Sequence, residues 1–209
     1  MPSAFEQNVF LNCPFDDRYR PILNSVLFCI LRAGLEPRLA LERVDSGENR
    51  LDKIIGLMRE CRFSIHDLSR CEAVRKGEIA RLNMPFELGI DYGLRQSGHE
   101  FSDKRFLVLD EKAYRLKQAI SDIAGWDTFA HEGIAERAQK EVRNWLVQEG
   151  HASLPGATIL FDEQLQFEEW KYGTPDHGRV DIDSWSPTER IKAQKRWESL
   201  GRPKNPDEQ

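Results

Sequence analysis

Short apolar runs and helical repeats alternate along the first 150 positions of the chain. The apolar runs have the length of strands and span 8–11, 37–41, 62–68, 105–110 and, more weakly, 126–130. Between them, apolar residues recur every three or four positions, which is the spacing of one helix face. These repeats follow Tyr19, Leu51, Pro85 and Ile134. The pattern predicts a βαβαβαβ order with a short fifth strand and a final helix.

The predicted strands are continuous apolar runs, which is typical of a parallel sheet covered by helices on both faces. We therefore expect a flavodoxin-like, doubly wound α/β fold with a mostly parallel five-stranded sheet. Ligands of such sheets bind beyond the carboxyl ends of the strands, where the strand order reverses. Polar residues follow the first three strands at 12–17, 42–45 and 67–69. These segments are expected to share that edge.

The chain of 209 residues is long enough for one full core. We assign 1–150 to a nucleotide-binding domain and 151–209 to a C-terminal extension, in which aromatic residues are mixed with charged residues and prolines. Ser186 and Glu189 are spaced as in a capping box, so short helices are expected in the extension. These helices pack either on their own domain or on a partner protein. Residues 201–209 are expected to be disordered.

Charge and cysteine content narrow the class of protein. The net charge is -5, from 30 basic and 35 acidic residues that are well mixed, so no basic surface for nucleic acid is expected. The four cysteines form no C-x-x-C pair, which favours reduced thiols and a cytoplasmic location. The N-terminal residues lack the basic and then apolar pattern of a secretory signal, the longest apolar run is too short to cross a membrane, and the five histidines lack the spacing of metal ligands. We expect neither a membrane nor a metal partner.

Glu87 is the candidate catalytic residue. With Pro85 at the first helical position, Glu87 falls in the first turn of a helix beside the predicted ligand edge. The helix dipole also favours an acid there, so a purely structural role stays open. A carboxylate beside a ribose stabilises the oxocarbenium-like transition state of N-glycosidic bond cleavage. Nicotinamide in NAD is already a cationic leaving group, so its release needs no strong general acid.

Four segments together resemble the Toll/interleukin-receptor (TIR) superfamily over the first two thirds of the chain. They are Val9-Phe10-Leu11-Asn12, Asp45-Ser46-Gly47-Glu48, Cys61-Arg62-Phe63-Ser64-Ile65 and Phe86-Glu87-Leu88-Gly89. The resemblance implies NAD as a substrate, which is hydrolysed or cyclised with Glu87 in the place of the family's glutamate. It also implies a homo-oligomer on activation and a role in bacterial antiviral defence. The last segment resembles, in addition, the glutamate motif of nucleoside 2-deoxyribosyltransferases, whose carboxylate attacks the sugar.

The remaining candidates are polar or aromatic residues near the ends of the predicted strands and the start of the Glu87 helix. Those expected near the base and ribose are Asn12, Phe15 and Asp16, and those near the sugar and phosphates are Asp67, Ser69 and Asn83. Asp16 is equally expected to cap the helix that follows it. We expect His66 to be a hydrogen-bonded structural residue, and Cys13 lacks a histidine that would make it a nucleophile.

Two other functions remain open from the sequence. One is a non-catalytic nucleotide-sensing or scaffold domain, whose crevice binds a ligand and whose C-terminal helices report its occupancy to a partner. The other is a nucleoside or nucleotide deoxyribosyl hydrolase or transferase. Activity on deoxynucleosides without activity on NAD distinguishes the latter from an NAD-consuming enzyme.

Overall fold

The computed structural model describes residues 3–42, 45–73, 76–77, 80, 82–116, 120–123, 125–151, 153–173 and 185–204. Its centre is a five-stranded sheet with the order β2-β1-β3-β4-β5, in which all neighbouring strands are parallel. The strands are β1 (Asn8–Asn12), β2 (Glu36–Leu39), β3 (Phe63–Asp67), β4 (Arg105–Asp110) and β5 (Thr128–Ala130). The flavodoxin-like α/β fold predicted from the sequence is confirmed.

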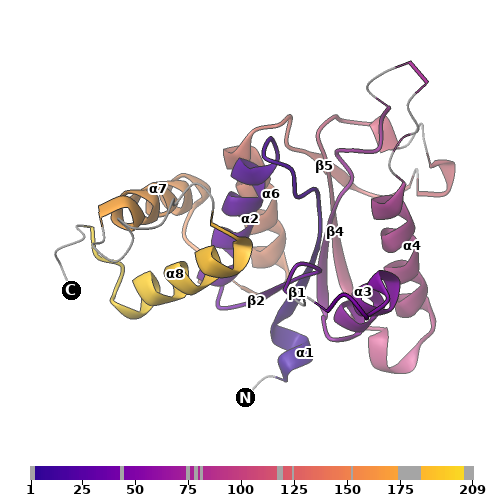
Figure 1. Cartoon of the computed structure of the whole chain (residues 1–209), viewed down its shortest axis with the longest axis horizontal. Helices are drawn as coiled ribbons and strands as arrows, with labels where there is room; N and C mark the ends of the chain where they lie inside the picture. The colour runs from indigo at the N-terminus through magenta and orange to yellow at the C-terminus, as the bar shows by residue number, and fades with distance from the viewer. Residues whose placement is uncertain are drawn as a thin grey trace.

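Helices cover both faces of the sheet (Figure 1). The short α1 (Ala4–Gln7) precedes β1; α2 (Arg20–Arg32) and α6 (Ala135–Gln148) cover one face, and α3 (Arg50–Arg59) and α4 (Asn83–Gln96) cover the other. Two 3-10 helices, η1 (His99–Phe101) and η2 (Ser121–Ile123), flank β4. Side chains of a strand alternate between the two faces. Val9 and Leu11 accordingly join the core under α2, and Phe10 packs against α3.

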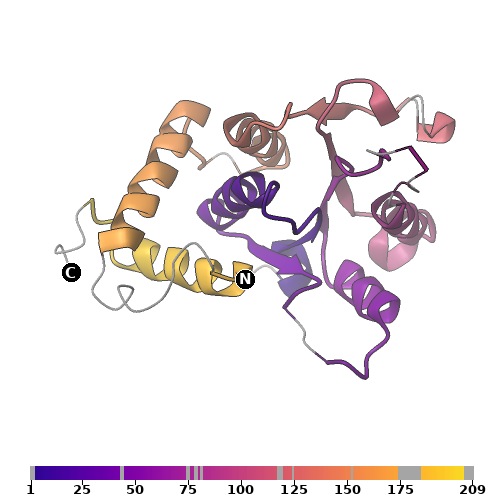
Figure 2. The same ribbon diagram turned by 45° about the horizontal axis from the view of Figure 1, so that its top comes forward.

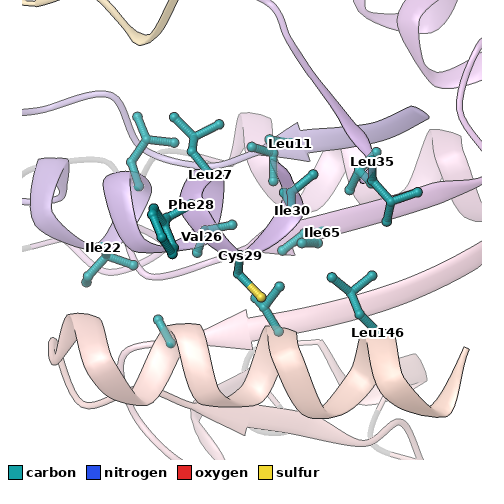
Figure 3. Close-up of a cluster of buried hydrophobic side chains, with 14 of the residues drawn as sticks. Leu11, Ile22, Val26, Leu27, Phe28, Cys29, Ile30, Leu35, Ile65 and Leu146 are labelled. Atoms are coloured by element: carbon teal, nitrogen blue, oxygen red, sulfur yellow. The ribbon is translucent and has the colours of Figure 1, made fainter. Parts of the chain in front are cut away.

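Helix α2 is buried on nearly all sides. Every residue from Ile22 to Leu31 except Asn24 is buried. A helix that is apolar all round needs partners on more than one side. One side of α2 faces the sheet and α6: Ile30 lies beside Ile65 of the sheet, and Cys29 points toward α6, which carries Leu146 (Figure 3). The opposite side requires a further layer, which the C-terminal part of the chain supplies.

That third layer is formed by α7 (Ala157–Gly173) and α8 (Pro187–Ser199), which lie outside α2 (Figure 2). The Phe28 ring of α2 lies 6.1 Å from Phe167 and 6.0 Å from Trp197, measured between ring centroids. The capping box of Ser186 and Glu189 is present at the start of α8. The extension therefore packs on its own domain and shares its main core.

Two expectations about the C-terminal region are wrong in part. Only short helices were expected, but α7 has 17 residues. Disorder was expected from Gly201 onward, but Pro203 is buried, and its carbonyl accepts a hydrogen bond of 3.0 Å from the indole Nε1 of Trp197. The rest of that segment, 205–209, lies outside the described residues.

Among the helices of the described residues, none is both long and apolar enough to cross a membrane.

Helix α4 begins earlier than its proline suggested. Its first residue is Asn83, so Pro85 is the third helical residue and Glu87 lies in the second turn. The expectation that Glu87 occupies the first turn is therefore wrong. Proline has no N–H to donate, and any of the first few helical positions suits it because their N–H groups have no partner within the helix. The sequence alone did not fix which of these positions Pro85 takes.

Candidate functional site

A cavity of about 390 Å³ opens at the carboxyl end of β1, between α3 and α4. The chain passes from β1 to β2 on one side and later returns to β3 on the other, so the strand order reverses at this point. Such a switch point is where ligands of doubly wound sheets bind. The predicted site residues that line this cavity, called here the Glu87 cavity, are Asn12, Phe15, Asp16, Asn83 and Glu87.

Glu87 is one of two acidic residues that line the cavity, and the other, Asp16, is paired with Arg70. Glu87 is only 7% exposed, and burial raises the pKa of its carboxyl group, against a smaller opposing effect of the Arg50 charge. Among the described residues its carboxyl oxygens have no hydrogen-bond partner, and neither oxygen is fully enclosed. A helix-capping role does not account for Glu87, because its carboxyl group accepts no backbone N–H of the helix start. The group is open to a ligand.

Asn12, the last residue of β1, also lines the cavity. Its side-chain Nδ2 lies 3.0 Å from the carbonyl oxygen of Met84 in α4 and 3.1 Å from Nδ1 of His66. Asn12 and His66 are register partners in β1 and β3, so their side chains share one face of the sheet. The residue is 4% exposed. The pairing fixes Asn12 between the sheet and α4.

Behind Asn12, a buried polar chain runs under α4. His66 Nε2 lies 3.1 Å from Asp91 Oδ2, and Asp91 Oδ1 lies 3.0 Å from Lys104 Nζ. Burial opposes ionisation of Asp91, but the hydrogen bond from His66 and the Lys104 charge hold its pKa below the ordinary value. The Lys104 ammonium also donates to the carbonyl oxygens of Met58 and Cys61. The expectation that His66 is a hydrogen-bonded structural residue agrees with this arrangement.

Sequence reasoning missed Asp91 and Lys104. Both side chains are fully buried, although aspartate and lysine are usually exposed. One signal was available: Asp91 follows Glu87 by four residues, which places both on the same face of a helix. Two acidic residues, Glu87 and Asp91, thus share the helix face that points to the predicted ligand site. Acids on that face indicate a buried polar network, because a solvated helix face would point away from the site.

Two arginine side chains, Arg50 and Arg70, line part of the cavity. Arg50 is the first residue of α3, and Arg70 follows β3. Arg70 forms ion pairs of 3.1 Å with Asp16 and 3.3 Å with Glu111. The hydrogen bond from Arg70 lowers the pKa of Asp16, whose Oδ1 also accepts the backbone N–H of Tyr19. Asp16 therefore holds Arg70 at the cavity and also caps the turn that leads into α2.

Asp67 and Ser69 do not line the Glu87 cavity, contrary to expectation. Asp67 follows His66 in β3, so its side chain points to the opposite face of the sheet. There its carboxylate accepts hydrogen bonds of 2.6 Å from the Tyr19 hydroxyl and 3.0 Å from His131 Nε2, and one from the Ser69 hydroxyl. Burial opposes its ionisation, yet the His131, Ser69 and Tyr19 hydrogen bonds lower the pKa of Asp67.

Ser69, His131 and Asp67 do not form a catalytic triad. A triad needs the serine on one imidazole nitrogen and the carboxylate on the other. Here the Ser69 hydroxyl and the Asp67 carboxylate both contact Nε2 of His131, at 2.9 and 3.0 Å. His131 Nδ1 accepts the backbone N–H of Gly133 at 3.0 Å, so the proton resides on Nε2. His131 thus has no free nitrogen to activate Ser69, and the cluster anchors loops at the sheet edge.

Cys13 also lines the Glu87 cavity but is not an activated nucleophile. Burial, together with the nearby charges of Asp67 and Glu87, raises the pKa of its thiol well above the ordinary value. A reactive cysteine needs the opposite environment, with a lowered pKa. In the described part of the chain, no cluster of three or more histidine, cysteine, aspartate or glutamate side chains is arranged to hold a metal ion. The chemistry of the cavity therefore centres on Glu87.

No family model, curated protein or solved structure matches the chain significantly. The case for a function accordingly depends on the geometry of the Glu87 cavity.

Proposed function

We propose that the chain is a TIR-like enzyme that binds NAD in the Glu87 cavity and cleaves the bond between nicotinamide and ribose. The supporting observation is the Glu87 carboxyl group, which is buried, has no partner in the described residues and opens into a cavity at the switch point of the sheet. A carboxyl group kept in this state has a cost in stability, which a function in the cavity explains.

In the proposed reaction the C–N bond to nicotinamide breaks, and its electron pair leaves with the nicotinamide nitrogen. The ionised Glu87 carboxylate stabilises the positive charge that develops on the ribose. Water then adds to that carbon and loses a proton, which gives ADP-ribose; attack by a nucleophilic group of the adenosine part gives a cyclic product. Arg50 and Arg70 are placed to contact the phosphates, and Phe15 offers an apolar surface for a base.

The test is nicotinamide release from NAD by the wild-type protein, a Glu87→Gln variant and a Glu136→Gln variant. Glu136 is an exposed acid in the first turn of α6, outside the cavity, and serves as the matched control. We expect release by the wild type and by the control, and none above background by Glu87→Gln. The assay is run over a wide range of protein concentration, because the proposed enzyme assembles into a homo-oligomer on activation. Release that Glu87→Gln leaves intact contradicts the proposal.

A nucleotide-sensing scaffold is the second candidate, and one observation favours it. The loop after β1 lines the cavity and leads directly into α2, which carries the layer formed by α7 and α8. A ligand in the cavity can therefore shift the loop and α2, and through α2 the C-terminal helices, to which a partner protein can bind. Tight nucleotide binding without turnover, over the whole concentration range, identifies this function.

The deoxyribosyl hydrolase or transferase is tested in the same assay with deoxynucleosides in place of NAD. We propose the cytoplasm as the site of action and antiviral defence as the role. A cell that expresses the active enzyme during infection is expected to lose NAD, whereas a Glu87→Gln strain is expected to keep it.

A further inference from the structure

The amide of Asn12 has only one orientation that satisfies its neighbours. The Met84 carbonyl oxygen can only accept a hydrogen bond, so the Asn12 atom that faces it at 3.0 Å must be the nitrogen. The same nitrogen lies 3.1 Å from His66 Nδ1. An amide nitrogen has two hydrogens and no acceptor site, so both hydrogens are used and His66 Nδ1 must be the acceptor.

This fixes the proton of His66. With Nδ1 accepting, a neutral imidazole carries its proton on Nε2, which donates to Asp91 Oδ2 at 3.1 Å. Asp91 is suited to receive it, since its lowered pKa keeps the carboxylate ionised and Lys104 balances the charge at 3.0 Å. The hydrogen bonds that join Asp91, His66 and Asn12 therefore have one direction, and Lys104 contributes an ion pair to Asp91.

The last atom of the chain is Asn12 Oδ1. It has no hydrogen-bond partner in the described residues, and it is not among the atoms there that are fully enclosed without one. Asn12 lines the Glu87 cavity, so this oxygen is the amide atom left for a ligand there. The lining of the cavity thus includes an amide oxygen and a carboxyl group, both of which accept hydrogen bonds when Glu87 is ionised.

We propose that His66 and Asp91 are positioning residues that hold Asn12 Oδ1 toward the cavity, and that the cavity thereby selects a ribosyl group with both of its hydroxyls. Two acceptors that line one cavity can receive the two hydroxyl donors of a ribose, whereas a 2-deoxyribose has only one of them. The choice of a ribosyl ligand rests on the proposed function. The orientation of the Asn12 amide is independent of that function, because it follows from the contacts of Asn12 with Met84 and His66.

The orientation is tested in the unliganded wild-type protein by the ¹⁵N chemical shifts of the His66 ring. We expect the neutral form with its proton on Nε2, because Nδ1 accepts from Asn12 and Nε2 donates to Asp91. His131, assigned to the same tautomer by its contact with Gly133, is the internal reference. A wild-type His66 with its proton on Nδ1 overturns the proposal.

The selection is tested by binding of ADP-ribose and of the analogue whose terminal ribose lacks the 2-hydroxyl. We expect the wild type to bind ADP-ribose about tenfold more tightly or better, as for the loss of one well-placed hydrogen bond. His66→Leu is expected to reduce the ratio to near one. His66→Gln is expected to keep it, because the glutamine amide can present an oxygen to Asn12 and a nitrogen to Asp91.

His131→Leu is the control for the loss of a buried imidazole outside the Glu87 cavity, and it is expected to lower stability without changing the ratio. A ratio that His66→Leu leaves unchanged, or a wild type that does not distinguish the two ligands, overturns the selection. Neither measurement needs turnover. A protein that shows the expected tautomer and ratio but does not cleave NAD therefore refutes the proposed function and leaves this inference standing.

Discussion

Glu87 and Asp91 lie four residues apart on the buried face of α4, yet the pKa values of their carboxyl groups shift in opposite directions. Burial raises the pKa of Glu87, which has no partner in the described residues. His66 and Lys104 overcome the same effect at Asp91 and lower its pKa. Two carboxyl groups in such different environments are suited to different roles. Asp91 is the ionised carboxylate between His66 and Lys104, and Glu87 is the carboxyl group that can contact a ligand.

The raised pKa of Glu87 predicts a pH-dependent effect of Glu87→Gln on stability. The folded protein holds the Glu87 proton more tightly than the unfolded chain does. The contribution of Glu87 to stability is therefore most favourable below its ordinary pKa of about 4.5, and it is lost as the pH rises through the raised pKa. We expect Glu87→Gln to be more stable than the wild type at pH 7 and to lose this advantage near pH 4. Urea unfolding at both pH values measures it. A stability advantage of Glu87→Gln that grows as the pH falls contradicts a raised pKa of Glu87.

The Tyr19 hydroxyl is expected to contribute to stability through Asp67. Tyr19→Phe removes a buried hydrogen bond of 2.6 Å to a carboxylate, and the expected loss is about 1.5–3 kcal/mol. Tyr92→Phe, at a hydroxyl with no hydrogen-bond partner in the described residues, is the control and should change stability by about 0.5 kcal/mol or less. Because the pKa of Asp67 is lowered, the loss should shrink as the pH falls through that value. Equal effects of the two variants argue against the network.

Trp197 tests whether α8 belongs to the core of the domain. It is fully buried, and its ring centroid lies 5.6 Å from that of Phe167 and 6.0 Å from that of Phe28. Trp197→Ala is expected to lower the free energy of unfolding by about 3–5 kcal/mol in a single cooperative transition. Chemical denaturation followed by circular dichroism measures this. A separate early transition of the C-terminal helices, with the sheet domain unchanged, indicates an independent appendage instead.

The cysteines are expected to react in the order of their environments. The Cys71 thiol is half-buried with its pKa raised to about 11, that of Cys61 is raised to about 12, and that of Cys13 is raised well above its ordinary value. Thiolates are the reactive form, so iodoacetamide should modify Cys71 first in the native protein. Mass spectrometry of timed samples gives the order. Rapid modification of Cys13 near neutral pH indicates an activated thiol in the cavity and contradicts this account.

The sheet was predictable because its strands are short apolar runs between helical repeats. The run from Val9 to Leu11 is buried on both faces of the sheet and has no polar position to confuse its assignment. Helix α7 was not predicted at its full length, because its apolar residues are not separated from its polar ones. Its buried residues Leu160, Phe167 and Trp170 are mixed with acids and glutamines, and exposed apolar side chains such as Ile159 lie between them. No single apolar stripe marks it as a helix.

The candidate site was predictable where one strand end and one helix meet. Asn12 and Glu87 come from segments that the fold places at the same edge, and both line the cavity. The error at Asp67 arose because a strand end supplies side chains to both faces of the sheet. His66 faces α4 and Asp67 faces Tyr19, so the choice between them depends on which face the cavity occupies. The sequence pattern of a fully buried strand does not contain that information.

We propose that the Glu87 carboxylate acts on a ribosyl bond in the Glu87 cavity. The most direct measurement is the rate of nicotinamide release from NAD by the wild type and by Glu87→Gln, at equal concentrations of folded protein and at rising pH. The account predicts that the variant is slower by about 100-fold or more. It also predicts that the wild-type rate increases as the pH passes through the raised pKa of Glu87. Equal rates for the two proteins would contradict the account.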